Sequence, residues 1–440
     1  MEAVVGGLIV LSLLLLFLGL GTWVFAGLLL VSVSGLALIL DMSPHRIGVI
    51  ATKIMYRYAS TWELAAIPMF IWMGEIVFRT DISDRLFRGL APLVDLVPGR
   101  LLHTNVLGCT MFAAVSGSSA ATTATIGKIT TTELARRKYD VDLSIGSLAG
   151  AGSLGLLIPP SIVMIIYGIL GEVSVARLFA AGVFPGLLVA ALYSTYIIFR
   201  CVAKPEYSPV AAEHYTLGQR LAGTVNLLPV IFLMFLVLGS IYSGLATPSE
   251  AAAVGVTATL VVTLILGQLN WPVFRDSVMG AVKTSCMVCI ILIAAAFLST
   301  AMGYLHIPAN IAKGIAILEL SPLELIVVLS VFYIILGCLL DGISIVVMSL
   351  PITLPLVLQA GFDPVWFGVF LVIMTELAQM TPPIGFNLFI LQGLTGHPIG
   401  RVAIAALPFF GLMCVAVVII TAFPQIALWL PSALFDLPKG

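Results

Sequence analysis

Ten long stretches without a charged side chain dominate this chain of 440 residues. They cover 3–40, 101–127, 143–171, 178–199, 221–249, 251–274, 284–312, 325–340, 342–362 and 402–435. A helix needs about 20 apolar residues to cross a bilayer, and shorter runs can fold back within it. Only 9% of the residues are charged, whereas soluble domains carry about 25%. The pattern predicts an all-α polytopic membrane protein with roughly 11–13 membrane-entering segments.

Paired prolines interrupt two of the apolar regions. Pro159-Pro160 follows Gly155, and Pro382-Pro383 precedes Gly385. Proline removes a backbone donor and clashes with the preceding turn, so each pair should break a helix. Inside a bilayer, such a break is tolerated where the freed backbone groups line a cavity or bind a ligand. Two corresponding breaks in the two halves of a chain are typical of a transporter binding site.

The surroundings of the two proline pairs are similar. Asp140 lies 19 residues before Pro159, and Asp363 lies 19 residues before Pro382. An aromatic residue precedes each aspartate, and a polar interruption lies upstream of each. We therefore expect a duplicated unit. The spacing does not distinguish parallel from inverted copies, but inverted repeats are common in transporters with broken helices, so we favour inversion.

The two polar interruptions are Ser116-Gly-Ser-Ser119 and Asp341-Gly-Ile-Ser344. Small hydroxyl residues can serve close helix packing, and Asp341 can be a helix cap. In turns, however, their oxygens and the freed carbonyls suit a hard cation. The N-termini of the helices after each break offer N–H groups to a carboxylate. The pattern thus favours cation-coupled uptake of an organic anion.

Other polar residues are assigned as follows. Glu376, six residues before Pro382, fits three roles equally: a structural partner of a cation, a proton site or an interfacial residue. Thr247-Pro248 before Glu250 predicts a capped helix start. We expect residues 42–60 to form an amphipathic helix in the membrane interface, or a short loop and the start of a span. Cys286 and Cys289 are expected to pack, because a metal site needs more ligands nearby.

The motifs together resemble the large, DctM-type membrane subunit of tripartite ATP-independent periplasmic (TRAP) transporters. The similar stretches, in the family's order, are Leu64–Gly74, Ser116–Thr122, Gly155–Ser161, Ala246–Ala253 and Thr381–Gly385. The family usually has Asn where Met374 stands and Gly where Ala378 stands.

The resemblance implies an elevator-type, sodium-coupled symporter with a scaffold and a transport domain that contains two helical hairpins. The corresponding regions are N-terminal scaffold helices (1–100), the first repeat (101–200), a linker and central scaffold helices (201–325), the second repeat (326–400) and a C-terminal helix (401–440). Substrate binding is expected at Ser118, Ser119, Thr122, Pro159, Ser161, Thr381, Pro382 and Asn387. Sodium binding is expected at Ser116, Gly117, Ser118, Gly155, Asp341, Gly342, Ser344, Thr381 and Gly385.

We expect a small organic acid as substrate, with a C4-dicarboxylate as the family default. The implied partners are a small DctQ-type membrane subunit, a periplasmic DctP-type binding protein and membrane lipid, but no nucleic acid. No cofactor is expected besides sodium ions, and the location is the bacterial inner membrane. One alternative is a divalent anion/sodium symporter that needs no binding protein. An intramembrane serine hydrolase using Ser118 or Ser119 is disfavoured, because no histidine is placed to act as its base.

Overall fold

The computed structural model describes residues 12–13, 16–17, 20–209, 215–307, 310, 321–338, 340–382 and 385–436. Within these ranges every regular element is a helix. The α-helices are α2 (Val24–Ile39), α3 (Pro44–Ala59), α4 (Ala66–Phe78), α5 (Ile82–Val94), α6 (Leu102–Ser116), α7 (Ser119–Arg136), α8 (Val141–Gly152), α9 (Ile162–Leu170), α10 (Val175–Ala203), α11 (Leu217–Tyr242), α12 (Pro248–Ile265), α13 (Trp271–Tyr304), α15 (Pro322–Gly337), α16 (Gly342–Gln359), α17 (Pro364–Gln379), α18 (Phe386–Thr395), α19 (Ile399–Ala422) and α20 (Gln425–Phe435). Three short 3-10 helices join them: η1 (Trp62–Ala65), η2 (Ser153–Gly155) and η3 (Pro205–Tyr207).

Many of these helices are apolar enough for a bilayer. Among the described residues, six are long and apolar enough to cross a membrane: α10, α11, α12, α13, α16 and α19. The segment containing α3, η1 and α4 passes the same test as a pair bent by 56°, and five further apolar helices are shorter. The predicted all-α polytopic fold is confirmed.

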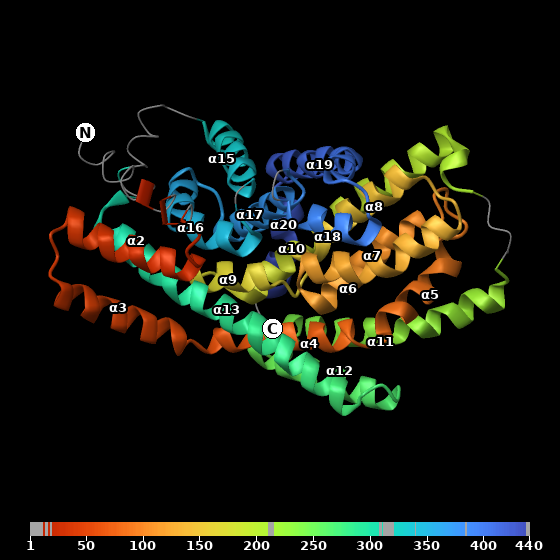
Figure 1. The fold of residues 1–440 in the computed structure, drawn as a ribbon, viewed down its shortest axis with the longest axis horizontal. Coiled ribbons are helices and arrows are strands. Elements are labelled where there is room, and N and C mark those ends of the chain that lie inside the picture. Colours follow the sequence, from red (N-terminus) through yellow and green to blue (C-terminus); the bar gives the residue numbers. More distant parts are fainter. Residues whose placement is uncertain are drawn as a thin grey trace.

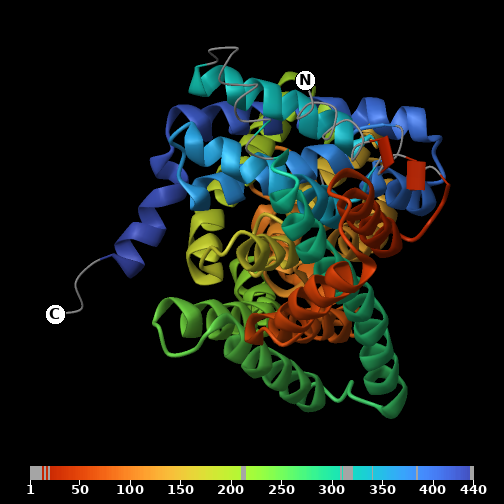
Figure 2. The ribbon, with the colours of Figure 1, turned by 90° about the vertical axis from the view of Figure 1, so that its left-hand side faces the viewer.

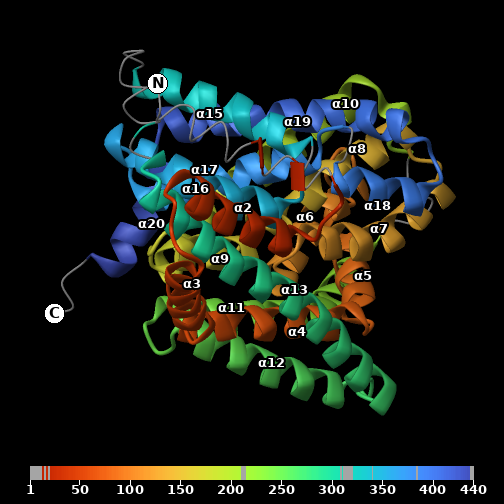
Figure 3. The ribbon, with the colours of Figure 1, turned by 60° about the vertical axis from the view of Figure 1, so that its left-hand side comes forward.

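The helices form two packed groups. Figures 1 and 3 show α3, α4, α11 and α12 along one side of the molecule and α15 and α19 along the other. The first group comprises α2–α5 and α11–α13, which pack on one another. The second comprises α6–α10 and α15–α20, and α6 and α9 contact α4 of the first group. Figure 2 shows α11–α13 (green) projecting below the second group.

Two units, each made of two helices separated by a break, run in opposite directions. In the first unit the break lies between α8 and α9, and in the second it lies between α17 and α18. The hydroxyl of Tyr167, near the end of α9, donates to the carbonyl of Pro364 at the start of α17, 2.6 Å away. At the other end, Arg401, in the first turn of the α19 helix that follows α18, pairs with Asp142 at the start of α8, with 2.7 Å between Nε and Oδ1. The end of each broken helix therefore lies beside the start of the other. The second unit is an inverted copy of the first, as favoured from the sequence.

The contacts at the helix ends define two opposite faces of the molecule. On the first face, which we call the basic face, Asp142 meets Arg401, and Arg100 donates to the carbonyl of Pro209 at 3.0 Å. The opposite face contains the Arg57–Glu172 pair at 3.6 Å and the Arg177–Asp436 pair. Helix α10 starts at the opposite face and ends at the basic face. Its 29 residues correspond to about 43 Å, enough to cross a bilayer and its headgroups.

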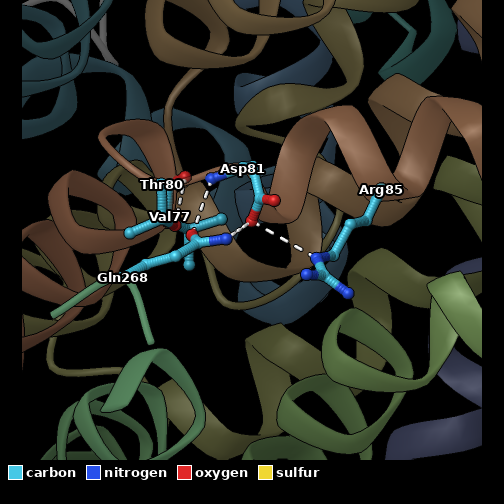
Figure 4. Close-up of polar contacts among 5 residues, drawn as sticks. All are labelled: Val77, Thr80, Asp81, Arg85 and Gln268. Carbon is cyan, nitrogen blue, oxygen red and sulfur yellow. Dashed lines mark hydrogen bonds and ion pairs between the residues drawn. The ribbon is translucent and has the colours of Figure 1, made fainter. Parts of the chain in front are cut away.

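A polar contact ties two loops of the first helix group together at the basic face. The amide N–H of Asp81, between α4 and α5, donates to Gln268 Oε1 at 2.9 Å. The Gln268 amide donates back to the Asp81 carboxylate, which also accepts from Arg85 at 3.3 Å (Figure 4). This pairing satisfies polar groups where α4 and α12 end, and so fixes the two helices relative to each other.

Two local predictions concern helix starts. Thr247 and Glu250 form a reciprocal capping box at the start of α12, which confirms the structural role expected for Glu250. The helix expected within 42–60 is present as α3. Its first turns pack through Ile47 on Phe297 and Ala301 near the end of α13, and its last turn carries Arg57. Both ends therefore lie at the opposite face, while its place in the membrane interface stays a prediction.

Candidate functional site

The first polar turn, which we call tip 1 (residues 116–119), packs on the helix break of its own repeat. Gly117 adopts the left-handed conformation with φ +60°, and a methyl group on it would lie 2.8 Å from the carbonyl oxygen of Pro160. A methyl group on Gly155 would lie 2.5 Å from the Cα of Ser119. Both glycines are therefore required for this close approach, because any side chain would collide with backbone.

The second polar turn, tip 2 (residues 338–344 without residue 339), packs on its own break in the same way. The thiol of Cys338 donates to the carbonyl of Pro382 at 3.4 Å. A methyl group on Gly342 would lie 2.8 Å from Nε2 of the Gln379 side chain. A methyl group on Gly337 would collide with the Cβ of Ala378, the position at which the resemblance to the family leads us to expect glycine. Gly337 thus makes room for the methyl group of Ala378.

Glu376 connects the two repeats. It lies on α17 of the second repeat with a fully buried side chain. Its Oε1 accepts the hydroxyl of Ser119 in tip 1 and the amide N–H of Leu156 in the first break, the latter at 2.9 Å. Leu156 also faces tip 2, because its Cδ1 would lie 3.6 Å from a methyl group on Gly342. The two tips and the first break therefore share one centre. Because Glu376 is fully buried at this centre, the interpretation of Glu376 as a residue of the membrane interface is wrong.

Side chains cap three of the four helices that begin at a tip or a break. Ser118 caps α7 and accepts from Ala121 N–H, Ser161 caps α9 and accepts from Met164 N–H, and Asp341 caps α16. The capping role considered for Asp341 is thus present. Its carboxylate also accepts the hydroxyl of Ser344. Helix α18 begins after Gly385 without a side-chain cap, and in its first turn the N–H of Leu388 donates to the Gly385 carbonyl at 2.9 Å.

Several predicted ligands already have partners within the chain. The hydroxyls of Ser116 and Thr122 bond to each other at 2.8 Å. Thr381 donates its hydroxyl to Leu377 at 2.8 Å, and its carbonyl accepts from the Gly385 N–H at 3.0 Å. Asn387 differs from these residues, because its side chain is fully buried and neither Oδ1 nor Nδ2 has a partner in the described part of the chain. Buried amides are almost always hydrogen-bonded, so Asn387 is the strongest ligand candidate.

The two repeats differ in their exposure. Residues 153–161 of the first break, including Pro159, are all buried, and so are Ser116, Gly117 and Ser119 in tip 1. In contrast, Asp341 and Pro382 are exposed. The sequence similarity of the repeats gives no sign of this difference. The difference in exposure arises because helices of the first group cover tip 1. Gly74 on α4, for example, lies close to the backbone of Ser116.

Two cavities lie between the helix groups, one at each face. The cavity at the basic face has a volume of about 790 Å³ and lies between the α4–α5 turn, α7 and the start of α13. Thr125 of α7 lines it, less than one turn beyond Thr122, and its hydroxyl has no partner among the described residues. The cavity at the opposite face has about 520 Å³ and is lined by Arg57, Glu172 and the start of α12. Each face therefore has an opening along the boundary between the groups.

Sequence reasoning missed several residues at the centre. Thr375, Gln379 and Leu156 were not predicted, and their contacts with tip 2 depend on packing. The only sequence signal was their position beside the proline pairs. The expectation that the cysteines bind no metal is untested, although the described residues contain no cluster of metal-binding side chains.

An inverted pair of broken helices, each closed by a polar hairpin tip and set among membrane-spanning helices, defines the class of secondary membrane transporters. The model of the family "Tripartite ATP-independent periplasmic transporter, DctM component" matches residues 10–426. The chain belongs to this family and is the large permease subunit of a TRAP transporter. It is a multi-pass membrane protein and not an enzyme.

Two relatives agree with this assignment, and a solved structure has a similar fold. The C4-dicarboxylate TRAP transporter large permease protein DctM of Pseudomonas aeruginosa is 34% identical over 407 residues, covering 91% of this chain and 93% of the relative. The isethionate TRAP transporter permease protein DctMQ of Oleidesulfovibrio alaskensis is 30% identical, covering 94% of this chain and 64% of the relative. The crystal structure of the YdaH transporter of Alcanivorax borkumensis is 15% identical with a TM-score of 0.60, covering 88% of this chain and 89% of that one. This likeness shows the fold alone.

Proposed function

We propose that this permease subunit imports a small organic acid by sodium-coupled symport. The observation that carries the proposal is the convergence of two hairpin tips and a helix break around one centre. Carboxylate, hydroxyl and carbonyl oxygens there suit sodium, while the uncapped start of α18 and the side chain of Asn387 suit a carboxylate. The ligands are those predicted from the sequence in tip 1, tip 2 and the two breaks.

The orientation of the chain in the membrane is inferred from the charges at the two faces. Loops and helix ends at the basic face carry Arg79, Arg85, Arg88, Arg100, Arg136, Arg137, Lys138, Arg200, Lys204, Arg220, Arg275 and Arg401, whereas the opposite face carries Arg46, Lys53, Arg57 and Arg177. Loops rich in Lys and Arg remain in the cytoplasm. We therefore place the basic face, with its 790 Å³ cavity, in the cytoplasm and the opposite face in the periplasm.

A C4-dicarboxylate is the proposed substrate. The names of relatives from Pseudomonas aeruginosa and Vibrio cholerae give C4-dicarboxylates, while that of a Ruegeria pomeroyi relative gives ectoine and 5-hydroxyectoine. The proposed partners are a small DctQ-type membrane subunit and a periplasmic DctP-type binding protein. The DctMQ name of the Oleidesulfovibrio relative supports a small DctQ-type subunit as a partner.

Uptake into proteoliposomes tests the proposal. Vesicles with this chain, its small subunit and the binding protein should accumulate labelled succinate when an inward sodium gradient is applied. Uptake that is unchanged without the gradient would contradict sodium coupling. Uptake without the binding protein would instead favour the alternative, a binding-protein-independent divalent anion/sodium symporter.

A further inference from the structure

The carboxyl group of Glu376 is buried without a countercharge. It forms no ion pair among the described residues, and its side chain has 0% exposure. An isolated carboxylate is very unfavourable in a water-free interior, so such a group either holds a cation or takes up a proton. The hydrogen bonds around the two carboxyl oxygens favour the protonated acid.

The two oxygens have different surroundings. Oε1 accepts two hydrogen bonds, from Ser119 Oγ and from the Leu156 N–H. Oε2 accepts none from the described residues. This is the pattern of a neutral carboxylic acid, in which the carbonyl oxygen accepts both bonds and the other oxygen carries the proton. An ionised carboxylate would instead leave Oε2 buried with a negative charge and no donor among the described residues.

No basic group faces Glu376 from the helices packed on α17. The titratable groups on that side are Tyr167 of α9, Tyr193 of α10, Tyr333 of α15, Asp341 at the start of α16 and Cys414 of α19. η2, α18 and α20 contribute none. The arginines at the ends of α10 and α19 are engaged elsewhere: Arg177 with Asp436, Arg200 with two tyrosines, and Arg401 with Asp142.

We propose that Glu376 is a proton-binding site that holds tip 1 closed across the two repeats. While the acid is neutral, it can stay buried and accept the bonds from Ser119 and Leu156. When tip 1 moves away, water enters, the Oε2–H bond breaks and the proton passes to water. Because the closed arrangement holds one proton more than the open one, lower pH favours closure of tip 1. This role goes beyond sodium coupling and does not depend on the substrate.

Infrared difference spectroscopy on the purified full-length chain tests the protonation directly. At neutral pH, the wild type should show the carbonyl band of a protonated carboxylic acid. The band should be missing in Glu376→Gln. Glu206→Gln is the control and should keep the band, because Glu206 is an exposed residue of η3. Ser119→Ala should shift the band to higher frequency, because a hydrogen bond to the carbonyl oxygen is lost. This shift keeps the test valid if Glu376→Gln fails to fold.

Hydrogen exchange of peptides covering residues 116–123 tests the link to tip 1. After correction for intrinsic rates, protection in the wild type should fall as pH rises, while protection in Glu376→Gln should be independent of pH. The proposal would be overturned by the absence of the band in the wild type, or by equal pH dependence in both proteins. It would also be overturned if Glu376→Gln lost sodium-induced thermal stabilisation, since Glu376 would then be an ionised cation ligand. None of these measurements requires transport, so they are independent of the proposed uptake.

Discussion

At the scale of single residues, the site contains polar groups that satisfy the fold and polar groups that the fold leaves unsatisfied. Ser116, Ser118, Ser161 and Thr381 all have partners within the chain. Asn387 has none among the described residues. Buried groups without partners cost stability, and a ligand bound to Asn387 would offset that cost. Among the predicted ligands, the four hydroxyls therefore also stabilise the fold, whereas both polar side-chain atoms of Asn387 are available to a ligand.

Replacing Asn387 by alanine should reduce uptake without loss of stability. The substitution removes no side-chain hydrogen bond to any residue that the structure describes, so the melting temperature should be unchanged or higher. Asn105→Ala is the matched control, because Asn105 donates to Ser147 at 2.9 Å and its removal should cost about 1–3 kcal/mol of stability. Uptake assays and thermal melting would check both variants. A clear destabilisation by Asn387→Ala would indicate a structural partner and refute the ligand role.

Asp341→Asn should weaken sodium binding while leaving the cap of α16 in place. Asparagine and aspartate are similarly good N-caps, so stability should change little, whereas loss of the charged ligand should reduce sodium affinity about tenfold or more. Asp363→Asn is the control, because Asp363 caps α17 away from the tips. Sodium-dependent melting shifts measure the effect. An unaltered sodium affinity in Asp341→Asn would leave Asp341 as a cap only.

At the scale of helices, glycine decides how closely a tip approaches its break. Four close approaches are made at glycines: Gly117 and Gly155 in the first repeat and Gly337 and Gly342 in the second. The sequence showed glycines beside polar residues, from which a turn could be predicted. It could not show that tip 1 lies on the first break, because that contact joins backbone segments about 40 residues apart, and no local preference determines it.

Gly155→Ala should displace tip 1 and abolish most uptake. The new methyl group would lie 2.5 Å from the Cα of Ser119. Because backbone cannot rotate away as the end of a flexible side chain can, the resulting strain should reduce the free energy of unfolding by about 1–3 kcal/mol. Gly393→Ala in α18 is the control, because nothing lies within 4 Å of the added methyl group. That change should stabilise the helix by about 0.5–1 kcal/mol. Thermal melting and uptake would check the pair, and normal uptake by Gly155→Ala would contradict the packing at tip 1.

At the scale of the whole molecule, the inverted repeat places equivalent structures at opposite faces. The pairs Arg401–Asp142 and Tyr167–Pro364 show where each broken helix ends. A cavity opens at each face along the boundary between the helix groups. Movement of one group along the other would change which face the shared centre meets, which is the movement implied by the family resemblance.

Cysteine labelling tests the orientation of the whole chain. In a background without the native cysteines, Glu172→Cys at the opposite face should react with an impermeant maleimide on intact cells. Thr132→Cys, which lines the cavity at the basic face, should react only after the cells are lysed. The reverse labelling pattern would place the basic face outside the cytoplasm. It would contradict the orientation proposed from the arginine and lysine distribution.

The sequence alone determined the membrane class, the two breaks, the polar tips and the helix caps. Each of these depends on properties of neighbouring residues: hydropathy over about 20 positions, the missing N–H of proline, or a side chain that reaches the next helical turn. The tertiary structure decided the inversion of the repeats, the burial of the first repeat and the exposure of Asp341 and Pro382. It also decided the place of Glu376, whose bond to Ser119 joins residues 257 positions apart. Such contacts arise from the packing of whole helices, so no local pattern could contain them.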